Sequence, residues 1–186
     1  MPIQLTEEEV ARSLLGVGPG LGKYWKVQRA FASTDVAHDR AFQKSFNGFY
    51  RVRRGASWQA AFFGLLQRSR QERPSFAATL RTLHRDTGRV EASFASKLVA
   101  TIDPNQPVID RFVLANLGLR LPSTRLLELR LKGIIDIHES IHCSYATFLG
   151  TGPGERLVAA FEQSFPGFPV TPVKMLDLVL WQQRDA

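Results

Sequence analysis

The stretch DTGRVEASFASKLVATIDPNQPVIDRFVLANLGL, residues 86–119, decides the fold. It predicts the end of one helix near His84, a turn at Gly88, a second helix over residues 91–102, and a third helix that Asp110 begins. Glycine ends helices because it adopts left-handed backbone angles without strain, and aspartate begins them because its carboxylate accepts a hydrogen bond from a free backbone N–H. The segment therefore predicts helices joined by short turns.

The rest of the chain carries the same kind of signal. Apolar spacing and capping residues predict further helices over residues 7–15, 23–31, 35–50, 58–67, 76–84, 123–149, 155–165 and 171–183. The alternation of β-branched residues that would predict strands is nearly absent. The sequence thus predicts an all-α fold, a single compact multi-helix domain over residues 1–186 that is either undivided or formed of two lobes.

A glycine-rich stretch, GVGPGLGK at residues 16–23, has some features of a phosphate-binding loop. That loop requires glycine where Val17 stands and a hydroxyl residue where Tyr24 stands. A strand should also precede it, whereas the pattern before it predicts a helix. We therefore interpret residues 16–22 as a flexible connector between two helices.

The positive charge of the chain is concentrated in one window. The formal net charge is +7, yet residues 40–89 contain eleven lysine and arginine residues against Glu72 and Asp86 alone. Most of the eleven are arginine, whose planar guanidinium suits phosphate oxygens better than a point charge does. We expect double-stranded DNA as the partner, and a solvated basic face without a partner is the alternative.

Cysteine content and hydropathy indicate the compartment. Cys143 is the single cysteine, so the sequence offers no internal disulfide and suits a reducing environment. No apolar run is long enough to span a bilayer, and the opening residues MPIQLTEEEV are acidic where a secretory signal would be basic. We expect a cytoplasmic monomer with no membrane partner.

An aromatic and basic stretch, residues 42–54, combines two patterns. One helical face carries the apolar side chains of Phe42, Phe46, Phe49 and Tyr50, and this spacing predicts core packing. Around the end of the helix stand the cations Arg51, Arg53 and Arg54, which remain free to contact phosphate. Base stacking on the aromatic rings is the alternative.

Residues 138–142 read HESIH, the HExxH pattern of zinc metalloproteases. In that pattern two histidines one helical turn apart hold zinc and the glutamate activates a bound water. The glycine-and-histidine continuation of the longer motif is missing, since Cys143 and Ser144 follow. We interpret His138 and His142 as surface histidines on a long amphipathic helix, with a zinc-dependent hydrolase that uses them and Glu139 as an alternative.

The sequence PVIDRFVLANLGL, residues 107–119, resembles the helix–hairpin–helix DNA glycosylase superfamily, to which endonuclease III and the 8-oxoguanine glycosylases belong. The family has Pro-x-x-Asp, a short helix and a leucine–glycine ending at this place. The resemblance implies a helix–hairpin–helix fold with the hairpin and the following helix at about residues 84–118. It also implies that Gly88 and Arg89 hold DNA phosphate and that Asp110 is the catalytic carboxylate beside the sugar of a flipped-out nucleotide.

Bifunctional members of the superfamily also use a lysine amine, which forms a Schiff base with the opened sugar. An ungapped match places Glu91 or Ala92 at that position, and Lys97 is the lysine nearby. Lys97 is therefore either a catalytic partner of Asp110, reached through a shortened hairpin, or a structural residue of a monofunctional enzyme.

These features together predict a DNA-binding base-excision protein that needs no cofactor: a DNA glycosylase, with or without lyase activity, acting on a damaged or modified base. Cleavage of an N-glycosidic bond builds positive charge on the sugar, which a carboxylate stabilises. The candidate DNA contacts are Arg51, Arg53, Arg54, Arg85, Gly88 and Arg89. A non-catalytic DNA-binding module on the same fold is the alternative.

Overall fold

The structure, a computed structural model, describes residues 3–183; the predicted domain over 1–186 also includes residues at both ends that lie outside this range. The described part is built of helices and contains no strand, which confirms the predicted all-α fold. The helices are α1 (Glu7–Ser33), α2 (Arg40–Tyr50), α3 (Ala56–Glu72), α4 (Phe76–Thr87), α5 (Ala92–Ile102), α6 (Arg111–Asn116), α7 (Leu127–Leu149), α8 (Gly152–Ser164) and α9 (Pro172–Gln182).

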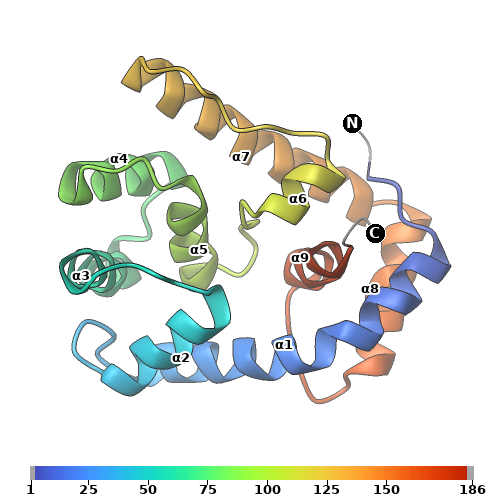
Figure 1. The fold of residues 1–186 in the computed structure, drawn as a ribbon. Coiled ribbons are helices and arrows are strands. Elements are labelled where there is room, and N and C mark those ends of the chain that lie inside the picture. Colours follow the sequence, from blue (N-terminus) through green and yellow to red (C-terminus); the bar gives the residue numbers. More distant parts are fainter. Residues whose placement is uncertain (1–2, 184–186) are drawn as a thin grey trace.

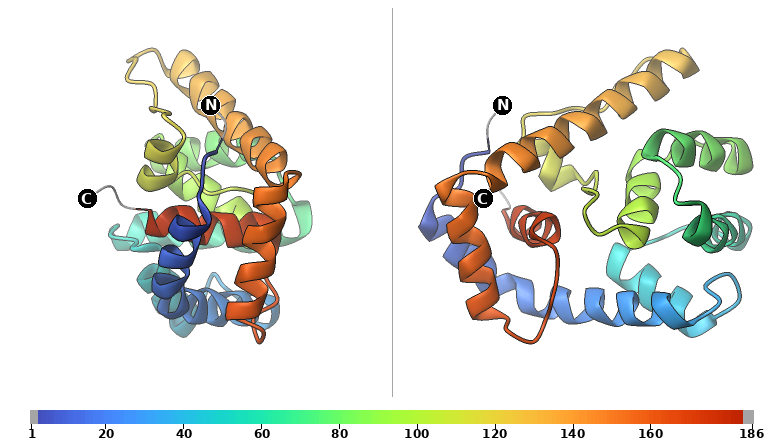
Figure 2. Two further views of the ribbon diagram at one scale, coloured as in Figure 1. Left: turned by 90° about the vertical axis from the view of Figure 1, so that its right-hand side faces the viewer. Right: turned by 180° about the vertical axis from the view of Figure 1, so that it is seen from behind.

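The helices form two groups that share the long helix α1. In Figure 1, α2 to α5 gather over one end of α1 and α6 to α9 over the other. The rear view in Figure 2 shows the same two groups, with the first turns of α7 reaching back toward α4. One continuous set of buried apolar side chains includes residues of both groups, so the described chain has a single core.

The predicted core face of α2 is confirmed. Phe42, Phe46, Phe49 and Tyr50 are all buried, and the ring of Phe46 lies 4.7 Å from that of Tyr50 and 5.4 Å from that of Phe62 on α3. Such ring pairs add to the free energy that burial of their apolar area contributes. The aromatic side chains therefore hold α2 and α3 together and are not free for stacking on bases.

The predicted connector at residues 16–22 is wrong, because α1 continues through it without a break. Val17 and Leu21 are fully buried there, and their packing outweighs the low helix propensity of the glycines. Pro19 has no N–H, which deprives the carbonyl of Leu15 of its helical donor. Leu15 is 86% exposed, so this turn of the helix lies on the solvent side, where water can replace the missing donor.

Two other predicted helices begin later than expected. Residues 35–39 form a turn, in which the Asp35 carboxylate accepts a hydrogen bond from the N–H of Ala37 at 3.0 Å, and Asp39 then caps α2. α7 begins at Leu127 and not at Ser123, because the preceding segment runs back along the helix (Figure 1). None of the helices between residues 3 and 183 combines the length and apolar character that a membrane crossing requires.

Candidate active site

The first element of the site is the amine of Lys97 on α5. α5 is buried along most of its length, and only 9% of the surface of Lys97 is exposed. The Lys97 Nζ lies 5.2 Å from the ring centre of Phe94 and 5.7 Å from that of Tyr50. Among residues 3–183 no carboxylate oxygen approaches this nitrogen closely enough to form an ion pair. Lys97 is therefore a buried amine held mainly by aromatic rings.

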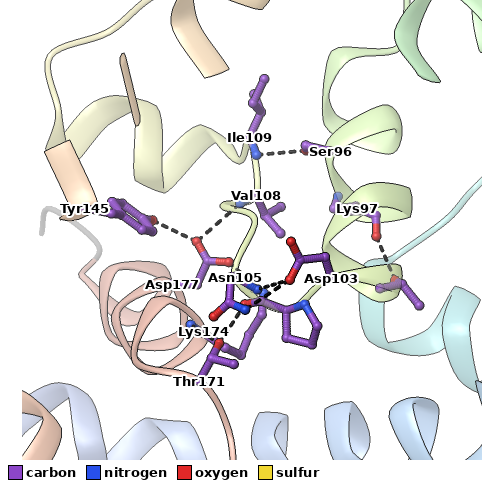
Figure 3. A network of polar contacts seen from close by, with 12 residues as sticks. Ser96, Lys97, Asp103, Asn105, Val108, Ile109, Tyr145, Thr171, Lys174 and Asp177 are labelled. Carbon is purple, nitrogen blue, oxygen red and sulfur yellow. Dashed lines mark hydrogen bonds and ion pairs between the residues drawn. The ribbon is translucent and has the colours of Figure 1, made fainter. Parts of the chain in front are cut away.

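The second element is the segment between α5 and α6, residues 103–110, which buried polar contacts hold in place (Figure 3). Ile109 donates its N–H to the Ser96 Oγ on α5 at 2.9 Å, and Val108 donates its N–H to the Asp177 Oδ1 on α9 at 3.4 Å. The Thr171 hydroxyl donates to the Pro104 carbonyl at 2.6 Å. Because buried backbone groups are costly to leave unpaired, these contacts define the path of the segment.

Asp110, at the end of this segment, begins α6. Its backbone is extended and its Oδ1 accepts a hydrogen bond from the N–H of Phe112 at 2.9 Å, so it is an N-cap as its place in the sequence predicts. Within the described chain the Oδ2 accepts no hydrogen bond, and the residue is half-buried. The cap therefore occupies one carboxylate oxygen and leaves the other available.

Lys97 and Asp110 line one small hollow, which we call the Lys97 hollow. Its volume is about 30 Å³, and its lining residues are Phe49, Tyr50, Lys97, Val108, Asp110, Val113, Lys174, Asp177, Leu178 and Trp181. A hollow of this volume is large enough to hold a water molecule. The sequence left open whether Lys97 reaches Asp110, and the structure brings the two side chains to the same hollow.

The surroundings favour the neutral form of the Lys97 amine. Burial lowers the pKa of Lys97 below its ordinary value; the Asp110 carboxylate opposes this change, and the positive charge of Lys174 makes a smaller contribution that lowers the pKa further. A neutral amine carries the lone pair that attacks an electrophilic carbon. The site thus combines a buried amine, whose protonation is disfavoured, with a carboxylate that can stabilise positive charge.

A buried ion pair on α9, missed by the sequence analysis, forms the opposite wall. The Lys174 Nζ lies 2.6 Å from the Asp177 Oδ2, and the Asp177 Oδ1 accepts a hydrogen bond from the Tyr145 hydroxyl at 2.7 Å (Figure 3). Burial opposes the charge on Lys174, yet the Asp177 carboxylate raises the pKa of Lys174 above its ordinary value. The available signal was a pair of charges three residues apart on an otherwise apolar helix.

A short non-helical turn joins α4 to α5 where the sequence analysis placed the hairpin. α4 ends with Gly88 in the left-handed conformation at φ 69°, which favours glycine, and α5 begins four residues later. The two arginines beside this turn form ion pairs with acidic residues of the same segment. Arg89 pairs with Glu91 at 3.2 Å, and Arg85 pairs with Asp86 at 3.1 Å.

The other predicted DNA contacts follow α2. Arg51 and Arg53 are exposed, and Arg51 directly follows Tyr50 of the Lys97 hollow. Arg54 donates two hydrogen bonds to the Glu91 carboxylate, at 3.0 and 3.1 Å, and its guanidinium lies 5.3 Å from the ring centre of Phe94. Arg51 and Arg53 therefore lie on the surface. Arg54 instead links the end of α2 to the start of α5.

The interpretation of His138 as a surface residue is wrong. It is 5% exposed, and its ring stacks on Phe76 with the ring centres 3.9 Å apart. Burial lowers the pKa of His138 to about 4, although a hydrogen bond to the Pro107 carbonyl opposes this change. His142 is half-buried, and residues 3–183 contain no group of three or more side chains arranged to hold a metal ion.

We expect His138 to make the protein sensitive to mild acid. Its pKa is lower in the folded chain than in the unfolded one, so its contribution is complete above pH 6.5 and is lost as the pH falls from 6.5 toward 4. Denaturant titrations of the wild type should show a loss of about 3 kcal/mol over this window beyond that of His138→Gln. The control is His142→Gln on the same helix, which should follow the wild type. Equal pH slopes for all three proteins would contradict the prediction.

Neither a scan against protein-family models nor searches of curated proteins and of solved structures gave a match to the chain.

Proposed function

We propose that this chain is a DNA glycosylase with lyase activity, built on a helix–hairpin–helix fold, that acts on a damaged or modified base in duplex DNA. The observation that carries the proposal is the meeting of the Lys97 amine and the Asp110 carboxylate at one hollow. Arg51 and Arg53 are exposed and follow Tyr50 of the same hollow in sequence, and in this proposal they hold the phosphates of a nucleotide turned out of the helix.

The chemistry uses each group in one role. The Lys97 lone pair attacks the sugar C1′, the bond from C1′ to the base nitrogen breaks, and the base leaves with that electron pair and takes up a proton. The Asp110 carboxylate stabilises the positive charge that develops on the sugar as the bond breaks. The amine nitrogen then loses a proton, the C1′–O4′ bond breaks and O4′ takes up a proton, which leaves a Schiff base between Lys97 and C1′.

The test is a panel of duplexes that each carry one altered base. At least one duplex should lose its base, and borohydride should trap a covalent adduct of protein and DNA that maps to Lys97. Lys97→Gln should form no adduct, whereas Lys132→Gln, which changes an exposed lysine on α7, should form as much as the wild type. Base release with an adduct at another lysine would refute the role of Lys97.

A non-catalytic DNA-binding module is the second candidate, and the small size of the Lys97 hollow favours it. Such a protein would bind duplex DNA with an affinity that falls steeply as salt increases, and would release no base from any member of the panel. This result would refute the glycosylase and retain the DNA-binding surface.

A further inference from the structure

The Lys174–Asp177 pair faces the candidate amine from α9, and nothing in the proposed reaction requires it. Both side chains are buried, at 3% and 5% exposure, and both line the Lys97 hollow. A buried ion pair contributes little to stability compared with apolar residues of the same volume. Its presence on the wall of a hollow that contains a second buried lysine therefore suggests a role at that lysine.

The contacts of Asp177 hold the cation in a defined position. Its Oδ2 binds the Lys174 ammonium, and its Oδ1 accepts from the Tyr145 hydroxyl on α7 and from the N–H of Val108. Val108 stands two residues before Asp110, so the same carboxylate fixes both the cation and the segment that carries the site's acid. The Lys174 Nζ also lies 5.4 Å from the ring centre of Tyr24 on α1.

We propose that Lys174 is a positioning residue of this site, a fixed positive charge on the wall of the Lys97 hollow that acts through Lys97 by disfavouring protonation of its amine. The groups that face Lys97 support this role: Asp110 at the start of α6, Lys174 and Asp177 on α9, and Tyr50 on α2. Lys174 is the one cation among them, and Asp177 and Tyr24 hold it in place. Asp110 opposes its influence, and Tyr50 is buried and neutral because burial raises the pKa of its hydroxyl.

The proposal deepens the proposed function, because a reactive amine matters only if Lys97 attacks the sugar. The reactivity of the amine can nevertheless be measured without DNA. Acetic anhydride labels neutral amines, and mass spectrometry of the Lys97 peptide against the exposed Lys26 gives the pH of half-labelling in the intact protein. A failure of the glycosylase proposal would leave this measurement unaffected.

In Lys174→Met, the pH of half-labelling at Lys97 should rise by about one unit, the order expected when one nearby charge is removed from a partly buried site. Lys174→Arg should keep the wild-type value because it retains the charge. Lys23→Met, which removes an exposed lysine of α1, should also leave it unchanged. If the wild type releases base, the acidic limb of the pH–rate profile should shift in Lys174→Met in the same direction as the pH of half-labelling at Lys97.

The double variant Lys174→Met with Asp177→Asn covers the case in which the single variant fails to fold. Asparagine retains an oxygen that accepts from Tyr145 and Val108, and it removes the unpaired carboxylate. The pH of half-labelling at Lys97 should rise in this protein too. The Asp177 oxygens bind Lys174, Tyr145 and Val108, so the added Asp177→Asn change should not cancel the effect of removing Lys174. An unchanged midpoint in a folded variant without Lys174, or an equal rise in Lys174→Arg, would overturn the proposal.

Discussion

Asp110→Asn should lower the rate of base release by a factor of about one hundred or more, the range usually found when a group that stabilises developing charge in the transition state is removed. The substitution keeps the shape of the side chain and an oxygen that can accept from the Phe112 N–H, so the N-cap of α6 remains. It removes the negative charge that faces Lys97 across the hollow. A single-turnover assay on the best duplex of the panel measures the effect on bond cleavage directly.

The chain provides a matched control for this substitution. Asp39 is also a helix N-cap, and it accepts a hydrogen bond from the N–H of Phe42 at 2.8 Å, but it lies outside the Lys97 hollow. Asp39→Asn should therefore keep the parent rate. If Asp110→Asn also cleaves at the parent rate while both variants remain folded, Asp110 is a structural cap and has no part in the reaction.

Asp177→Ala should reduce the free energy of unfolding at pH 7 by about 3–5 kcal/mol. The substitution leaves the Lys174 ammonium buried without a partner, and the Tyr145 hydroxyl and the N–H of Val108 also lose their acceptor. A urea titration followed by circular dichroism gives the change directly. The expected loss is a large part of the total stability of a domain of this size.

An exposed ion pair on α7 serves as the comparison. The Lys132 Nζ lies 2.7 Å from the Asp136 Oδ2, nearly the separation found in the buried pair, but both side chains are more than half exposed. Asp136→Ala should therefore cost less than about 1 kcal/mol. Similar losses for Asp136→Ala and Asp177→Ala would show that the α9 pair is solvated in solution and would remove the physical basis of its role beside Lys97.

The sequence predicted the parts of the site that depend on neighbouring residues. Asp110 was placed at a helix start and Gly88 at a helix end because both roles follow from backbone hydrogen bonds within a few residues. The nearness of Lys97 to Asp110 was not predictable. It depends on the path of residues 103–110, and that path is held by Thr171 and Asp177, more than sixty positions along the chain.

The errors have the same origin. The burial of His138 depends on Phe76, which belongs to a different helix. The HExxH pattern itself contains no information about this contact. The glycines of residues 16–22 locally favour a break in the helix, and only the burial of Val17 and Leu21 overrides them. In both cases contacts remote in sequence outweighed a short-range preference.

The continuous course of α1 has a consequence for the order of folding. A helix that contains a proline and several glycines nucleates and propagates poorly when isolated in water. It therefore gains its stability from the helices that cover it. In this chain those helices include α8 and α9, which are the last in sequence. The first helix of the polypeptide therefore reaches its full stability only after the closing segment of the chain has folded onto it.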